Sequence, residues 1–509
     1  MKEEGRCAGP WWPALALVAA TLLLRLLTAP TAVDSLDAIL FVKGLARYSV
    51  LEARPHWPGY PVYMAVGHLI QLLRGDAEAS LRLISILASS LSVWPLMALV
   101  RDWRLSAGGP SGDAGRSAVM AGLLWMLSPM SWLVGTEIGS DPLGLLMALI
   151  VLWLCSRVAA SPSPKPRPLL AAGALAGLLL GVRLPYGSLL LPVVHALRRQ
   201  ALSPGERRRT GRTLVGWAVV TMVPVMGWLG WQLWKDGATF FEMAHLRLAA
   251  HYGNWTERVL AHGNWFARPA SLARVILVDG LGGWWPGLPL TRMVVTLGWA
   301  VLIVSGLRRL RTCAVARAML ALWALPYLTM ILLFNDVAFA RYAFPLVAGL
   351  CLLGGLGTPA GRSMALGSTA AMASALAAVV VPLAWEHRSS PLPGVQWVRY
   401  LAQHARSDRS AVVITDQVPV VSLIVEQYAP EFPHALVSLS EMPAEVAARE
   451  AEGRRVYSTS PDPTAPQEWT PVACFARNPL LQSRGPWEIW LYEHGGEPAR
   501  RRPSCRVHS

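Results

Sequence analysis

The chain has 509 residues, of which 53% are hydrophobic and only 15% charged, and its mean hydropathy is +0.39. This balance excludes an ordinary soluble protein and favours a chain that lies mostly within a membrane. The formal net charge of +15 does not indicate nucleic-acid binding, because much of it lies in short loops between apolar stretches. No phosphate-binding loop or glycine-rich dinucleotide fingerprint is present, so no nucleotide site is expected.

Apolar stretches recur along the first three quarters of the chain. A hydrocarbon core of ~30 Å requires ~20 apolar residues per helix, fewer where the ends are anchored. Residues 169–197 are broken at Arg183-Leu184-Pro185 into two short halves, which form either two compact spans or a re-entrant hairpin. The predicted fold is a mainly α polytopic transmembrane helix bundle. With these two halves counted separately it has about eleven spans: 11–28, 81–100, 117–135, 141–156, 169–197 as a pair, 213–234, 291–306, 318–334, 343–357 and 364–385.

Lysine and arginine are concentrated in alternate loops, as an eleven-span topology requires. By the positive-inside rule these loops face the cytoplasm of a plasma or inner membrane, with the N-terminus inside and the C-terminus outside. The basic segments are 2–6, 101–116, 157–167, 198–212, 308–317 and 362. The segments predicted on the outer face are a first loop at 30–80, the turn 135–141, a large loop at 235–290, the turn 335–342 and everything after about 385.

The composition changes after residue 385. Residues 386–509 contain short apolar runs, such as AVVIT, HALVSL, TPVACF and WEIWLYEH, together with helical-looking stretches. They predict a small extracytoplasmic α/β domain that follows a membrane domain at 1–385. The six cysteines include no CxxC pair and no Cys/His cluster with zinc-ligand spacing. Cys474 and Cys505 either form a disulfide in an oxidising compartment or remain two free thiols.

Ionisable residues collect at the outer ends of the predicted spans. A carboxylate at the water–lipid boundary is costly unless it is solvated, paired or used. Group transfer from a lipid phosphate to a hydroxyl needs a base for the acceptor proton, and cations that hold the phosphate as charge develops on the leaving oxygen. The outer span ends offer both types of residue: Asp34 and Asp37, Glu137 and Asp141, Arg183, Asp336, and Arg341-Tyr342.

The order of these motifs resembles the C-type (GT-C) integral-membrane glycosyltransferases, over about three quarters of the chain. Asp34-Ser35-Leu36-Asp37 followed by His56-Trp57-Pro58-Gly59-Tyr60-Pro61 is similar to the bacterial protein O-mannosyltransferase-like branch, which has Asp-x-x-Glu and then His-Pro-Pro-Gly-Tyr-Pro. Asp141-Pro142 at the opening of a span, and Arg341-Tyr342 before Phe344-Pro345, extend the resemblance. Two departures are that Asp37 stands where the branch usually has glutamate and that Trp57 replaces the first proline.

This resemblance implies inverting transfer of a sugar from a polyprenyl-phosphate donor to an acceptor hydroxyl on the outer face. No cofactor is assigned; a divalent metal stays open but is not indicated, no metal ligands are proposed, and no nucleic-acid partner is expected. The partners implied are the lipid-linked sugar and the bilayer. The roles implied are catalysis for Asp34 (the general base) and Asp37, donor or acceptor binding for His56, Tyr60, Glu137 and Asp141, and lipid-phosphate binding for Arg341, Arg183 and Tyr342.

Each candidate residue also has a purely structural interpretation. Asp34 could cap a helix that begins at Ser35, with Asp37 at its third position in imitation of a capping box. His56 could form a hydrogen bond with a neighbouring carbonyl. Arg183 could lie at a span end and extend its charged group to the membrane interface. Arg341 could anchor its span at the interface and face Asp336.

Two other classes of function compete with the enzyme. A transporter or lipid-carrier flippase would place ionisable residues near the bilayer midplane and often shows internal repeats, neither of which we find. A non-catalytic membrane scaffold would leave the acids and arginines of the outer span ends unexplained.

Overall fold

The computed structural model describes residues 12–33, 35–161, 165–202, 207–251, 267–335, 337, 339–416, 419–460, 465–481, 488–496 and 505–507. The chain divides into two compact units. We call residues 1–29 and 41–384 the membrane unit, and residues 30–40 and 385–509 the C-terminal unit. The segment 30–40, which carries two of the candidate acids, therefore groups with the C-terminal unit.

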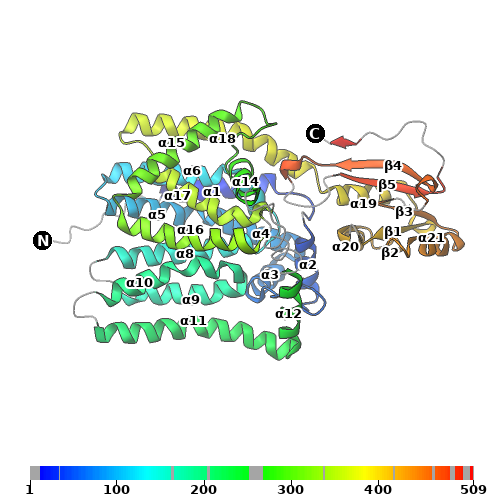
Figure 1. Ribbon diagram of the computed structural model, residues 1–509, viewed down its shortest axis with the longest axis horizontal. Coiled ribbons are helices and arrows are strands. Elements are labelled where there is room, and N and C mark those ends of the chain that lie inside the picture. Colours follow the sequence, from blue (N-terminus) through cyan, green and yellow to red (C-terminus); the bar gives the residue numbers. More distant parts are fainter. Residues whose placement is uncertain are drawn as a thin grey trace. The chain divides into compact units, whose positions relative to one another are not determined.

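The membrane unit is a bundle of helices, shown in Figure 1. Its first half contains α1 (Trp12–Thr28), α2 (Leu36–Ala46, which begins in the C-terminal unit), α3 (Pro61–Arg74), α4 (Ala77–Leu91), α5 (Val93–Ser106), α6 (Ser111–Met126), α7 (Pro129–Thr136), α8 (Asp141–Ala160) and α9 (Pro166–Val182). Its second half contains η1 (Leu184–Leu190), α10 (Pro192–Ala201), α11 (Arg207–Asp236), α12 (Thr239–His251), α14 (Ala267–Arg274), η3 (Val275–Gly280), α15 (Arg292–Leu310), α16 (Ala314–Phe334), η4 (Ala340–Ala343), α17 (Phe344–Leu356) and α18 (Arg362–Ser389).

Many of these helices are apolar enough to cross a membrane. Within the described residues, six helical stretches are long enough, one of them made of α4 and α5 together. A seventh span results if the bent pair α6–α7 is counted as one. Three further apolar helices are shorter, namely α1, α9 and the stretch 340–356. The predicted helical membrane fold is confirmed, whereas the count of eleven spans stays a prediction.

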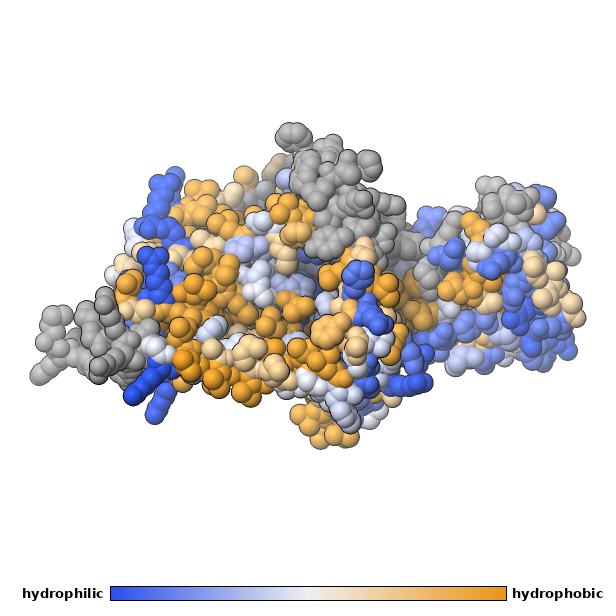
Figure 2. Space-filling view, turned by 60° about the horizontal axis from the view of Figure 1, so that its bottom comes forward, coloured by the Kyte–Doolittle hydropathy of each residue, from blue (hydrophilic) through white to orange (hydrophobic). Residues whose placement is uncertain are grey.

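The surface of the bundle fits a lipid environment. Figure 2 shows a broad apolar face across the helices of the membrane unit. Along α11 the exposed side chains include Val215, Val219, Val223 and Met226, which are 53–64% exposed. Such a continuous exposed apolar surface is unfavourable in water and favourable in a bilayer. The chain is an integral membrane protein.

Prolines set the breaks in the bundle. Helix α9 ends at Val182, the 3₁₀-helix η1 follows with Pro185, and α10 starts at Pro192. Proline lacks a backbone N–H, so it ends one hydrogen-bond ladder and is tolerated at the start of the next. Pro129 likewise opens α7, which is bent by 58° from α6. The break predicted at Arg183 is therefore present.

Several basic loops lie together at one end of the bundle. Arg116 forms an ion pair with Asp113. Arg309 donates to the Leu356 carbonyl at 2.7 Å and lies close enough to Arg104 and Asp113 to interact with their charges. Loops that the sequence places on one side of the membrane thus meet in space. Which side that end faces stays a prediction.

The C-terminal unit has a six-stranded mixed sheet in the order β2-β1-β3-β5-β4-β6. Strand β1 pairs in parallel with β2 and β3, whereas β5 is antiparallel to β3 and β4. Five strands fall on the apolar runs identified in the sequence, and β6 was not predicted. The elements are α19 (Pro393–His404), β1 (Ser410–Thr415), α20 (Pro419–Tyr428), β2 (His434–Val437), α21 (Met442–Ala451), β3 (Arg455–Ser458), β4 (Trp469–Ala476), β5 (Glu488–His494) and β6 (Arg506–Val507).

The core of this unit lies between the sheet and its helices. Val413 on β1 and Val456 on β3 pack with Met442 and Val446 of α21, all of them 0–4% exposed. Burying such side chains stabilises a small domain by ~1.5–3 kcal/mol each. The all-buried pattern of β1 is typical of a parallel strand covered on both faces.

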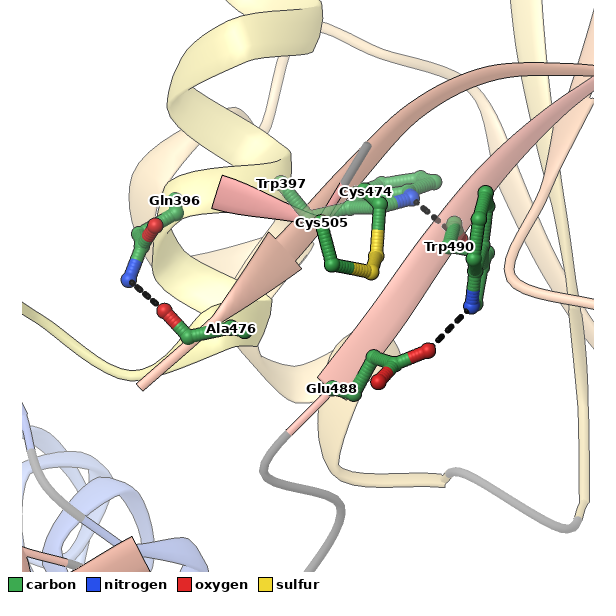
Figure 3. The surroundings of a disulfide bond; sticks show 7 residues. All are labelled: Gln396, Trp397, Cys474, Ala476, Glu488, Trp490 and Cys505. Carbon is green, nitrogen blue, oxygen red and sulfur yellow. Dashed lines mark hydrogen bonds between the residues drawn. A yellow bond between two sulfur atoms is a disulfide. The ribbon is translucent and has the colours of Figure 1, made fainter. Parts of the chain in front are cut away.

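Cys474 and Cys505 form a disulfide, shown in Figure 3. Cys474 lies on β4, and Cys505 directly precedes β6, which pairs with β4. Of the two alternatives left open by the sequence, the paired one is present. Within the described residues, the one cluster with metal-ligand spacing is Cys474, Glu488 and Cys505. Its two sulfur atoms are already bonded to each other, so it does not offer a metal site.

Candidate active site

The turn from His56 to Tyr60 is the most constrained part of the site. Gly59 and Tyr60 have positive φ angles of 83° and 50°, and the Gly59 N–H donates to the His56 carbonyl at 2.9 Å. Pro61 then opens α3, where its missing N–H costs nothing. The backbone therefore presents His56 and Tyr60 at the N-terminal end of a helix.

Helix α11 holds this turn through Gln232. The Gln232 side chain is fully buried, donates to the Pro58 carbonyl at 3.3 Å and accepts from the Tyr48 hydroxyl at 2.8 Å. A Cβ atom on Gly59 would lie 2.3 Å from the Tyr48 oxygen and 2.5 Å from Gln232 Nε2. Glycine is thus required here by both its φ angle and the lack of space.

His56 and Tyr60 interact directly. His56 Nε2 lies 2.9 Å from the Tyr60 hydroxyl oxygen, and Phe41 packs edge-on against the Tyr60 ring with centroids 4.9 Å apart. Tyr60 also lies close enough to Arg183 for an electrostatic interaction. The interpretation of His56 as a partner of a neighbouring carbonyl is replaced by this contact with a hydroxyl.

Asp141 and Arg183 form a buried ion pair. Arg183 Nε lies 2.8 Å from Asp141 Oδ1, with the two side chains 7% and 3% exposed. The Tyr186 hydroxyl donates to the same carboxylate oxygen at 3.0 Å, and Arg183 Nη1 donates to Ser140 Oγ at 3.3 Å. Asp141 opens α8, and a helix N-terminus favours a negative charge. Most of the charge of Arg183 is therefore offset within the protein.

Arg341 and Tyr342 enter the same neighbourhood from η4. The guanidinium of Arg341 lies 5.4 Å from the Phe339 ring and 5.5 Å from the Tyr342 ring. It is close enough to Arg183 for the two positive charges to repel each other. Two neighbouring guanidinium groups are suited to binding a phosphate. The membrane unit thus brings together Tyr60, Asp141, Arg183 and Arg341 from four separate segments.

The other predicted residues are not gathered by these contacts. Glu137 is half-buried at the C-terminal end of α7, where its N–H donates to the Leu133 carbonyl at 3.1 Å. Asp37 is the second residue of α2 and belongs to the C-terminal unit. Asp34 and Asp336 lie outside the described residues.

The proposed helix cap is corrected by the structure. The Ser35 hydroxyl accepts the Ala38 N–H at 3.2 Å, so Ser35 caps α2. Asp37 then stands at the second helical position and not at the third, so it does not complete a capping box. Asp and Ser are both strong N-cap residues, so the sequence left this choice open, and Asp34 itself lies outside the described residues.

Sequence reasoning missed several buried polar residues of the membrane unit. Tyr186 and Gln232 were treated as parts of apolar stretches, although a polar side chain inside a span is itself a signal. Arg25, 1% exposed within α1, donates to Ser131 Oγ at 2.5 Å. Among the residues that the structure describes, its Nε and Nη1 atoms have no hydrogen-bond partner. These residues were hidden because their partners lie far away in the sequence.

A further carboxylate lies in the large loop between α11 and α15. Asp279 belongs to η3, a π-helix that packs against η4 and α7. Burial raises the pKa of Asp279 to about 6, although the nearby Arg274 and Arg292 lower it. Short π-helical segments occur frequently at functional sites.

A family model agrees with this part of the chain. The model described as dolichyl-phosphate-mannose-protein mannosyltransferase matches residues 54–231. The match includes the His56–Tyr60 turn, Glu137, Asp141 and Arg183, and it excludes Asp34 and Arg341. It covers less than half of the chain.

Solved structures show the same fold. The chain is similar to the crystal structure of ArnT from Cupriavidus metallidurans bound to undecaprenyl phosphate, with 13% identity, a TM-score of 0.53, and coverage of 96% of this chain and 98% of that one. For the apo state of ArnT the values are 14%, 0.54, 94% and 97%. The resemblance to the fold of C-type glycosyltransferases is thereby confirmed. None of the curated proteins matches the chain significantly.

Proposed function

We propose that this protein is an integral-membrane glycosyltransferase that moves a sugar from a polyprenyl-phosphate carrier to an acceptor hydroxyl on the outer face of the membrane. The observation that carries the proposal is the cluster of the buried Tyr60, Asp141 and Arg183 with the half-buried Arg341. Most of this cluster lies inside the segment matched by the mannosyltransferase family model. The likeness to a fold solved with undecaprenyl phosphate supports the lipid carrier as donor.

In the proposed reaction, Asp34 takes the proton of the acceptor hydroxyl. The acceptor oxygen attacks the anomeric carbon while the bond from that carbon to the phosphate oxygen breaks. The electron pair leaves with the polyprenyl phosphate, and a single displacement inverts the anomeric configuration.

Cations hold the leaving phosphate in this proposal. Arg341 and Arg183 supply this charge, and Arg183 also pairs with Asp141. Arg183 and Tyr186 hold the Asp141 carboxylate, while His56 and Tyr60 face the sugar or the acceptor. No step of the proposal requires a cofactor.

The deciding experiment uses the purified full chain in lipid nanodiscs with a radiolabelled polyprenyl-phosphate sugar. We expect Asp34→Asn to lower transfer by ~10²–10⁴-fold, the usual contribution of a positioned general base. A matched control is Asp76→Asn, because Asp76 caps α4 and asparagine caps equally well. If Asp34→Asn transfers sugar as fast as the unmodified chain, the general-base assignment fails.

The same preparation distinguishes the rival functions. A transporter or flippase would move the labelled lipid between leaflets without releasing polyprenyl phosphate. A non-catalytic scaffold would bind it without consuming it. Release of polyprenyl phosphate coupled to labelling of an acceptor is the result expected here.

A further inference from the structure

The segment that carries the proposed base is built into the C-terminal unit. Residues 30–40 group with residues 385–509 by their contacts. Within this segment Ala32, Val33, Ala38 and Ile39 are 0–1% exposed. A loop at the end of a membrane span is ordinarily mobile and solvated, whereas this one has a packed interior.

A hydrogen bond fixes the residue directly before Asp34. The Val33 N–H donates to the hydroxyl oxygen of Tyr428 at 2.9 Å, across 395 positions of sequence. Two residues further on, the Ser35 hydroxyl accepts the Ala38 N–H and begins α2. These two bonds hold the backbone N–H groups of Val33 and Ala38.

Tyr428 is itself rigidly placed. It is the last residue of α20, whose Val421, Ile424 and Val425 side chains are 0–1% exposed. Helix α20 packs against α19 and against strands β1 and β2. The position of Val33 is thereby set by the core of the C-terminal sheet.

We propose that the C-terminal unit positions the catalytic segment, and that Tyr428 is the positioning residue that fixes the backbone beside Asp34. This inference rests on the proposed function, because it takes Asp34 as the base. A displacement of about 1 Å of a catalytic group can cost ~10²-fold in rate. Loss of the Tyr428 hydroxyl releases the Val33 N–H and loosens the segment without touching a substrate.

The first test measures the hydrogen bond directly. Tyr428→Phe is expected to speed hydrogen exchange in a peptide covering residues 31–40 of the full chain. The matched control is Tyr400→Phe in α19, because the Tyr400 ring stacks on His404 and its hydroxyl takes part in no hydrogen bond within the described residues. Unchanged exchange in Tyr428→Phe would overturn the proposal.

The second test is a double-mutant cycle on turnover. In the unmodified background, Tyr428→Phe is expected to lower kcat ~10–100-fold and to leave KM for the lipid donor nearly unchanged. In the Asp34→Asn background the same change is expected to cost less than twofold, because no base remains to be positioned.

The outcomes separate the two proposals. An equal loss in both backgrounds, or no loss in the unmodified one, means that Tyr428 does not act through Asp34. An Asp34→Asn variant as active as the unmodified chain refutes the general base itself. The exchange measurement still reports on the Tyr428–Val33 bond in that case.

Discussion

The candidate residues lie in two units of the molecule, and each unit holds its own candidate residues in a different way. In the membrane unit, Asp141 has two partners within the protein, Arg183 and Tyr186, so its charge is compensated before any ligand arrives. In the C-terminal unit, Val33 and Ala38 are held through their backbone N–H groups, by Tyr428 and by the Ser35 cap. A change to the ion pair of the membrane unit is expected to affect both stability and the rate of transfer. A change in the C-terminal unit can alter the rate of transfer while the buried ion pair stays intact.

The largest expected effect follows from breaking that ion pair. Asp141→Asn leaves Arg183 as a buried charge without its carboxylate, which costs ~3–5 kcal/mol of unfolding free energy. Replacing both residues, as in Asp141→Leu with Arg183→Met, is expected to recover much of the loss because no charge remains buried. Denaturant unfolding of the purified variants in detergent measures both. An Asp141→Asn variant as stable as the unmodified chain would show that the pair carries little energy.

Removing the disulfide is the corresponding test of stability in the C-terminal unit. It closes a segment of 31 residues between Cys474 and Cys505, so its loss is expected to destabilise this unit by ~3–4 kcal/mol through the entropy of the unfolded chain. Pulse proteolysis in urea, with fragments assigned to each unit, compares the unmodified chain with the Cys474→Ala, Cys505→Ala double variant. The membrane unit is expected to keep its midpoint. Reductant should shift the unmodified chain and leave the double variant unchanged.

Gly59→Ala probes the turn that carries His56 and Tyr60. The positive φ angle and the close approach of Tyr48 and Gln232 predict a loss of ~2–4 kcal/mol from strain and overpacking. Gly75→Ala is a useful control, since Gly75 also has a positive φ but open space around its Cβ position. Thermal unfolding in detergent checks the difference. Equal losses in the two variants would mean that the contacts with α11 do not constrain the turn.

Arg341→Ala separates the two arginines of the membrane-unit cluster. If Arg341 holds the lipid phosphate, its removal costs ~1.5–3 kcal/mol of binding, the value of a hydrogen bond to a charged group. Binding of polyprenyl phosphate to nanodisc-embedded protein should weaken by ~10–150-fold at constant salt. Arg47→Ala, which removes an exposed arginine paired with Glu52, serves as the control. Unchanged affinity in Arg341→Ala would remove the phosphate assignment.

The comparison also shows what the sequence could predict. Apolar length and Pro185 are local signals, so the helical bundle and its break at Arg183 were predictable. The β-strand runs after residue 385 were predictable for the same reason. The bend before Pro129, inside the predicted span 117–135, was not predicted. The α2 cap was local but ambiguous, because Asp34 and Ser35 are adjacent and both cap well.

The contacts that build the site could not be predicted from local sequence patterns. Gln232 meets Pro58 across 174 positions, and Tyr428 meets Val33 across 395. No periodicity or motif spacing encodes such pairs, since they arise from the way whole elements pack. The sequence therefore predicted residue types that gather at the ends of spans, and missed Gln232 and Tyr428, which hold their neighbours in place.

The smallest expected effect tests whether the C-terminal unit responds to pH independently of the membrane unit. Burial lowers the pKa of His494 on β5, but hydrogen bonds to Glu450 at 2.7 Å and Glu468 at 3.2 Å outweigh it and raise that pKa above its ordinary value. Because the folded pKa lies above the unfolded value of about 6.5, protonated His494 stabilises the folded unit below that pH. The contribution is lost as the pH rises through the folded pKa.

We therefore expect the urea midpoint of the C-terminal unit to fall as the pH is raised from about 6 to about 9, and to fall less in His494→Gln. His404→Gln, at the exposed end of α19, should keep the pH dependence of the unmodified chain. An equal slope in His494→Gln would assign the pH dependence to other groups. A parallel shift in the urea midpoint of the membrane unit in the same samples would show that the two units do not respond to pH separately. The contrast between the two units would then fail.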